Sequence, residues 1–179
     1  RVPVVDLNDL HDALGFPRIV SDNAAIGRLG AGPLLERGIR RFGFCGFSRE
    51  PWSSERRDGF VGAVRRAGGD CSVFESVWRG RDVPTWEDDQ RDIRAWIAAL
   101  PRPAGIMTCN DVRGLHVINA AALLGIAVPE ELAVVGVDNE VTFCELCDPP
   151  LSSVAPDPER IGFEAAALLE SLMRGRRRP

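Results

Sequence analysis

Continuous apolar runs alternate along the chain with longer segments in which apolar and polar residues are mixed. The runs that we expect to form strands are Arg41–Phe47, Cys71–Val77, Ala104–Thr108 and Leu132–Val137. The mixed segments that we expect to form helices run from a capping Ser53 or Ser54 to Ala67, from Trp86 to Leu100, and from a capping Asp111 to Gly125. Leu132–Val137 is the most apolar run, and its lack of polar alternation indicates a strand that is covered on both faces.

The two ends of the chain carry weaker signals. The segments expected to be extended there are Val2–Val5, Arg18–Val20 and Leu151–Ala155. The helices expected there run from Asp22 or Asn23 to about Gly38, and from Asp157 to Met173. Gly27, Gly30, Gly32 and Pro33 weaken the first of these helices, because each interior glycine costs about 1 kcal/mol.

Alternation of strands and helices with short connections predicts an α/β fold. The expected architecture is a parallel sheet flanked by helices on both faces. A chain of 179 residues fits one ordinary domain or two small lobes, and its core needs neither disulfides nor metals.

Composition narrows the class of protein further. The charged fraction of 27% and the apolar fraction of 45% are those of a globular domain, which excludes a disordered tail. No apolar run approaches the length of a membrane span, so we expect no membrane partner. The net charge is −4, and the basic residues cluster only at Arg174 and Arg176–Arg178, so this chain is not expected to bind DNA by itself.

Cysteine usage indicates a reducing, cytoplasmic setting, because five is an odd number and most of the cysteines have apolar neighbours. The pair Cys144 and Cys147 has the spacing of a redox or half-zinc motif, but no second pair of ligands accompanies it. The histidines, His11 and His116, are isolated. We therefore interpret these cysteines as core or loop residues, and we expect neither a metal nor a cofactor.

In an open α/β sheet, ligands bind at the carboxyl ends of the strands. The residues at those ends are Asn8, the segment 48–57, Trp78, Asn110 with Asp111, and Asp138 with Asn139 and Glu140. Carboxylates, a guanidinium and amides bind the hydroxyls of a neutral polyol, while an indole covers its apolar C–H face. This set therefore favours a sugar as the ligand.

Several of these residues also have plainer interpretations. Asp111 could serve only as a helix cap, Asp138 could cap its loop, and Arg56 could form a surface salt bridge within its charged run. Asp111 and Asp138 could also form a carboxylate or magnesium pair. No phosphate-binding glycine loop, nucleophile elbow or zinc-protease motif occurs, so we expect no enzyme.

Three motifs carry a family resemblance. They are Glu55-Arg56-x-x-Gly59-Phe60, Cys109-Asn110-Asp111, and the run from Gly125 to Asn139 that is closed by Pro150-Leu151-Ser152-Ser153-Val154. The chain resembles the ligand-binding domain of LacI/GalR-type transcriptional regulators, which shares the fold of periplasmic sugar-binding proteins. Within that family it looks closest to xylose-operon regulators of the XylR type, which carry a C-terminal AraC-type helix-turn-helix domain.

The resemblance implies a set of sugar contacts. The family pattern places them on Arg56, Asn110 and Asp138, and the aromatic cover falls on Trp78 or Trp52. Asn8 matches the place where the second lobe contributes a polar contact, although the sequence around it departs from the usual pattern. The implied ligand is a monosaccharide, with D-xylose as the favoured candidate, and the implied assembly is a homodimer.

The resemblance also implies an organisation. Residues 1–23 would be a remnant of the N-terminal lobe, 24–145 the C-terminal lobe, and 146–179 the crossover back with the final helix of the N-terminal lobe. DNA would be bound only by a helix-turn-helix domain outside this chain. The alternatives are a solute-binding protein of a sugar transporter and, less favoured, a metal-dependent sugar-phosphate enzyme that uses Asp111 and Asp138.

Overall fold

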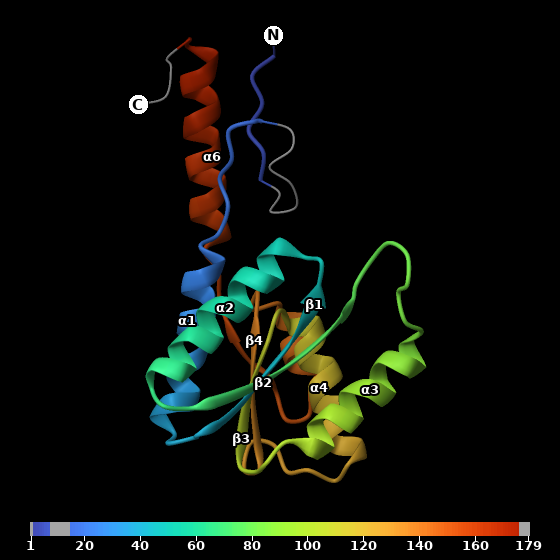
Figure 1. Ribbon diagram of the computed structural model, residues 1–179. Coiled ribbons are helices and arrows are strands. Elements are labelled where there is room, and N and C mark those ends of the chain that lie inside the picture. Colours follow the sequence, from blue (N-terminus) through green and yellow to red (C-terminus); the bar gives the residue numbers. More distant parts are fainter. Residues whose placement is uncertain (1, 8–14, 176–179) are drawn as a thin grey trace. The chain divides into compact units, whose positions relative to one another are not determined.

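The computed structural model describes residues 2–7 and 15–175, and it divides the chain into two compact units (Figure 1). The larger unit is Asn23–Ala155, and the smaller unit joins Arg1–Asp22 to Pro156–Pro179. The assignment of these units to the two lobes of a sugar-binding domain, with the boundaries given above, stays a prediction.

The larger unit is built on a five-stranded sheet in the order β2-β1-β3-β4-β5, and every pair of neighbouring strands is parallel. Its strands are β1 (Arg41–Ser48), β2 (Asp70–Val77), β3 (Ala104–Thr108), β4 (Leu132–Val137) and β5 (Ser152–Val154). Its helices are α1 (Asn23–Glu36), α2 (Pro51–Arg66), α3 (Trp86–Ala99), α4 (Asp111–Leu123) and α5 (Val141–Leu146). The predicted α/β fold with a parallel sheet is confirmed.

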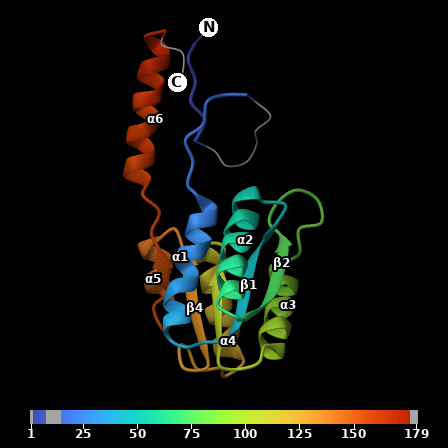
Figure 2. The ribbon, with the colours of Figure 1, turned by 60° about the vertical axis from the view of Figure 1, so that its left-hand side comes forward.

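Helices cover both faces of this sheet, with α1 and α2 on one side and α3 and α4 on the other (Figures 1 and 2). Successive residues of a strand point to opposite faces, so one strand supplies both cores. In β3, Met107 packs with Phe44 and Phe60 under α1 and α2, whereas Ile106 packs with Ile97 under α3 and α4. This double burial explains why the strands read as continuous apolar runs.

Glycines bring α1 and α2 unusually close together. A Cβ atom on Gly27 would lie 2.1 Å from the carbonyl oxygen of Arg56, and one on Gly59 would lie 2.2 Å from that of Ala24. No other residue leaves room for the two backbones to approach in this way. The glycines that weaken α1 by propensity therefore set its contact with α2, the helix that carries Arg56.

Two predicted helix starts were wrong. Helix α2 begins at Pro51, because proline suits the first turn, and the capping position is Glu50. Ser53 is buried, and its Oγ accepts the backbone N–H of Phe47 at 3.0 Å. At α4 the cap is Asn110 and not Asp111, because Asn110 Oδ1 accepts the backbone N–H of Arg113 at 3.0 Å.

The smaller unit contains α6 (Pro158–Met173), whose predicted cap is confirmed, because the Asp157 carboxylate accepts the backbone N–H of Arg160 at 2.9 Å. Val2–Val5 forms no strand. Among the described residues of this unit, extended pairing is limited to one parallel bridge between Asp6 and Arg18. A single bridge supplies too few hydrogen bonds to make a strand from the apolar run.

Candidate functional site

Arg56 and Asp138 form an ion pair at the carboxyl edge of the sheet. Nη1 of Arg56 lies 3.1 Å from Oδ1 of Asp138, and the same nitrogen donates to the carbonyl oxygen of Cys109 at 2.7 Å. Nε of Arg56 donates to Oδ1 of Asn23 at 3.0 Å. Three separate elements therefore fix one guanidinium: the start of α1, the end of β3 and the end of β4.

Arg56 is buried, so the plainer interpretation of it as a surface salt bridge was wrong. The neighbouring Arg57 makes that bridge instead, with its Nη1 at 2.9 Å from Oε2 of Glu75 and its Nε at 2.9 Å from Oδ1 of Asp58. Adjacent residues on a helix point about 100° apart, which separates the two guanidiniums.

Asp138 keeps part of its carboxylate available for a ligand. Its side chain is 46% exposed, whereas that of Arg56 is only 8% exposed. Oδ1 of Asp138 accepts the bond from Arg56, so the remaining lone pairs can accept hydroxyl groups.

Asn110 stands beside this pair, directly after Cys109, whose carbonyl oxygen binds Arg56. Its Oδ1 is used in capping α4. Within the part of the chain that the structure describes, its Nδ2 donates to no protein atom, so that nitrogen is left to donate to a ligand.

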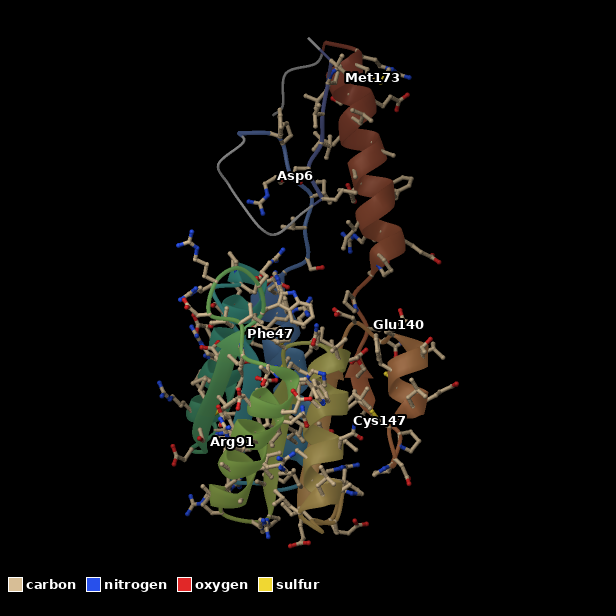
Figure 3. The ribbon with its side chains drawn as sticks, turned by 90° about the vertical axis from the view of Figure 1, so that its right-hand side faces the viewer. Asp6, Phe47, Arg91, Glu140, Cys147 and Met173 are labelled. Atoms are coloured by element: carbon tan, nitrogen blue, oxygen red, sulfur yellow. The ribbon has the colours of Figure 1, made fainter. Side chains whose placement is uncertain are left out.

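Two indoles lie at the same edge, and Phe47 at the end of β1 links them. The Phe47 ring centroid lies 6.3 Å from that of Trp52 and 4.5 Å from that of Trp78. The guanidinium of Arg56 lies over the Trp52 ring, 5.2 Å from its centroid. Phe47 and Glu140 mark the end of the larger unit at which the site lies (Figure 3).

A single buried carboxylate organises both indoles. Glu50 Oε2 accepts Nε1 of Trp52 at 3.1 Å, and Oε1 accepts Nε of Arg79 at 2.6 Å. Arg79 directly follows Trp78, so Glu50 ties down the segment that holds the second indole. The sequence analysis included Glu50 in the segment 48–57 but gave it no role.

The predicted site residues are thus brought together to different degrees. Arg56 and Asp138 are in contact, Trp52 lies under Arg56, and Trp78 joins them through Phe47. Asn110 is adjacent through the backbone. Asn8 lies outside the described residues.

Sequence reasoning also missed a buried ion pair under the aromatic residues. Arg113 of α4 is fully buried, binds the carboxylate of Asp89, and places its guanidinium 4.3 Å from the centroid of the Phe47 ring. The signal was an arginine in a helix, α4, in which Asp111 is the only other charged residue. Burial, with Arg113 adding to it, lowers the pKa of the nearby His116 to about 4, so its imidazole is neutral at pH 7.

A cavity lies beside Trp78. Its volume is ≈ 130 Å³, and its walls include Phe47, Trp78, Trp86, Asp89 and His116. The positive charge of Arg113 behind it is matched by Asp89, and the histidine is neutral. The cavity therefore favours an uncharged group.

Asp111 is not arranged as a metal ligand. Burial raises the pKa of its carboxyl, and its two oxygens accept hydrogen bonds from Ser153 Oγ at 2.6 Å and from the Glu140 backbone at 2.8 Å. In the described ranges, no three histidine, cysteine or acidic side chains gather as metal ligands would. Burial and the Asp111 carboxylate raise the pKa of the Cys144 thiol to about 11, which supports a structural and not a redox role.

Comparison with known proteins identifies this architecture. The sequence profile of the periplasmic binding protein-like domain matches residues 31–179. The chain belongs to that family. The xylose operon regulatory protein of Haemophilus influenzae is 36% identical over 165 residues, which cover 90% of this chain and 42% of that protein.

Two solved structures of transcriptional regulators have the same fold as this chain. A xylose-binding transcription activator, XylR, superposes with a TM-score of 0.81 at 31% identity, over 99% of this chain and 48% of that one. A complex of the transcriptional regulator CelR with cellobiose gives a TM-score of 0.75 at 27% identity, over 92% of this chain and 51% of that one.

These relatives are transcriptional regulators and not enzymes. The chain spans about half the length, or less, of the relatives that it matches. None of the helices in the described ranges has the length and apolar character that crossing a membrane requires.

Proposed function

We propose that this domain senses a monosaccharide for a bacterial transcriptional regulator, and that D-xylose is its ligand. The observation that carries the proposal is the ion pair of Arg56 and Asp138, at the strand ends where ligands of open α/β sheets bind. Two of the related proteins named above are xylose regulators, and the third binds cellobiose, so sugar is the class of ligand that they share.

The chemistry of the site suits sugar hydroxyls. Asp138 offers free carboxylate lone pairs, and Nδ2 of Asn110 offers a donor. A hydrogen bond to a charged group contributes about 1.5–3 kcal/mol, so Asp138 and Arg56 would supply most of the polar affinity. The indoles of Trp52 and Trp78 would cover the C–H face of the ring.

The same site disfavours a phosphorylated sugar. The charge of Arg56 is already matched by Asp138, and that of Arg113 by Asp89. A phosphate would bring excess negative charge towards half-exposed Asp138, and the buried arginines Arg56 and Arg113 are already paired with carboxylates. A neutral sugar meets no such repulsion.

Regulation would follow from differential affinity. A sugar that binds the closed arrangement of two lobes more tightly than the open one shifts their equilibrium by that difference. In a cytoplasmic homodimer, this shift would change the geometry of helix-turn-helix domains carried outside this chain. Asn8 is proposed as a contact from the second lobe.

A thermal-shift panel on the full-length protein tests the proposal. The ligands are D-xylose, D-ribose, D-glucose, cellobiose and D-xylose 5-phosphate. A ligand at a hundred times its Kd adds about 2.7 kcal/mol of stability, so we expect D-xylose to raise Tm by a degree or more. A shift with the phosphate ester alone, or with no neutral sugar, would contradict the proposal.

The regulatory part has a separate test. Binding of the full-length protein to DNA upstream of its own gene should change by tenfold or more when D-xylose is added at saturation. Sugar binding by a protein that has no affinity for such DNA would favour the transporter alternative.

A further inference from the structure

The turn that carries Asp138 has a costly backbone conformation. Asp138 has φ of 105° and Asn139 has φ of 51°, and neither residue is glycine. Non-glycine residues at positive φ persist where the surrounding structure fixes them. The position of the Asp138 carboxylate therefore depends on whatever holds this turn.

Side chains from two other elements hold it. The backbone N–H of Asn139 donates to Oγ of Ser153 at 3.0 Å, and that of Glu140 donates to Oδ2 of Asp111 at 2.8 Å. Ser153 Oγ in turn donates to Oδ1 of Asp111 at 2.6 Å. The Asp111 carboxylate thus restrains two consecutive peptide groups, one directly and one through Ser153.

Asp111 itself is out of reach of a ligand. It is only 2% exposed, and both of its oxygens are engaged. The sheet is shaped to admit it, because a Cβ atom on Gly136 would lie 2.2 Å from its Oδ1. Asn110 already caps α4, so capping does not account for the buried carboxylate.

We propose that Asp111 is a positioning residue for the sugar site: its carboxylate holds the Asp138–Glu140 turn so that Asp138 faces Arg56. The inference rests on the proposed sugar-binding function, and it adds that sugar affinity depends on a residue that never touches the sugar. The same network reaches Ser153 of β5, so it also joins the site to the strand that ends the larger unit.

The variants are chosen to separate positioning from general stability. Asp111→Ala removes both acceptors. Asp111→Asn keeps one oxygen to accept the Glu140 N–H, and its Nδ2 can donate to Ser153 Oγ once the Ser153 hydroxyl hydrogen has rotated away. Ser153→Ala removes a single hydroxyl, and it replaces Asp111→Ala as the test variant if Asp111→Ala does not fold. Glu131→Ala is the matched control, because Glu131 Oε2 accepts the backbone N–H of Ala127 at 3.0 Å next to the opposite end of β4.

The first readout is independent of any ligand. Hydrogen exchange of the Asn139 and Glu140 amides in the full-length protein should be at least tenfold faster in Asp111→Ala and close to wild type in Asp111→Asn. Glu131→Ala should leave both amides protected. Unchanged protection in Asp111→Ala and Ser153→Ala would overturn the inference, whatever the protein binds.

The second readout is D-xylose affinity by titration calorimetry in the same protein. We expect Asp111→Ala to raise Kd about tenfold, and Asp111→Asn and Glu131→Ala to raise it less than threefold. In an Asp138→Asn background, Asp111→Ala should cause no further loss, because it acts through Asp138. Full additivity would contradict positioning, whereas a wild type that binds no sugar would instead overturn the proposed function.

Discussion

Nη1 of Arg56 lies 3.1 Å from Oδ1 of Asp138, although 82 positions separate the two residues along the chain. They meet because the first turns of α2 and the end of β4 converge at the carboxyl edge of a parallel sheet. One partner is buried and the other half-exposed, so the pair presents a fixed carboxylate to the edge of the sheet.

The close contact between α1 and α2 supports this pair, because α2 carries Arg56. Gly27→Ala should lower the free energy of unfolding by about 1–3 kcal/mol, because its Cβ would meet the backbone oxygen of Arg56. Gly62→Ala in α2 is the matched control. Its Cβ would meet only the flexible end of the Arg66 side chain, at 3.3 Å, so it should stabilise the protein by about 0.5–1 kcal/mol through helix propensity.

Urea unfolding of both variants provides the measurement. Equal effects of the two substitutions would show that the close approach of α1 and α2 does not constrain the fold. Gly27→Ala should also weaken sugar binding, since it displaces the backbone of Arg56.

The sequence predicts most of this fold because strands buried on both faces leave an unambiguous signal. Leu132–Val137 was predicted with the bounds that β4 has. Two failures were local: Pro51 started α2 earlier than the serines suggested, and α5 (Val141–Leu146) is too short to show a helical period. The glycines of α1 lower its predicted helix propensity. Their role, a close contact with the backbone of α2, cannot be recognised from the sequence of α1 alone.

For the candidate site, the rule that ligands bind at strand ends singled out residues that the structure places along one edge. It could not find the residues behind them. Asn23 binds Arg56 across 33 positions, and nothing in the segment 48–57 distinguished Glu50 from its neighbours. Such contacts depend on tertiary packing between distant segments, and the spacing of residues within one segment does not predict them.

Glu50 supports both indoles of the site. Glu50→Gln should weaken its bonds to Trp52 and Arg79, because an amide lacks the charge and offers one acceptor in place of two. We expect D-xylose affinity to fall about three- to tenfold and tryptophan emission to shift to the red. The control is Asp58→Asn, which removes an exposed carboxylate next to Arg57. An unchanged affinity in Glu50→Gln would show that the indoles hold their positions without it.

The buried pair of Arg113 and Asp89 should matter for stability. Arg113→Met leaves the Asp89 carboxylate buried and unpaired, which should cost about 3–5 kcal/mol of unfolding free energy. Arg91→Met removes a guanidinium from the solvent-exposed pair with Asp88 on the same helix as Asp89, and should have no measurable effect. Denaturant melts distinguish the two, and a mild effect of Arg113→Met would indicate that water reaches Asp89.

His116 should make stability depend on pH. Its pKa is about 4 in the folded protein, below the ordinary histidine value of 6.5, so the unfolded chain binds a proton more readily. Stability from this group is therefore complete above about pH 6.5 and is lost as pH falls towards 4, by up to about 3 kcal/mol. In His116→Gln, the difference in unfolding free energy between pH 7 and pH 4.5 should be smaller than in wild type. A curve parallel to that of wild type would contradict the lowered pKa.

The central claim is that a neutral sugar binds at the buried Arg56 and its partner Asp138. The most direct measurement is titration calorimetry of the full-length protein with D-xylose in Arg56→Lys and Arg57→Lys. Lysine cannot reproduce the bonds of Arg56 to Asn23, Cys109 and Asp138 together, so we expect Kd to rise at least tenfold. Arg57→Lys changes only the bridges to Glu75 and Asp58 and should leave Kd within twofold of wild type. Equal affinities in the two variants, with both proteins folded, would place the sugar elsewhere and contradict the account.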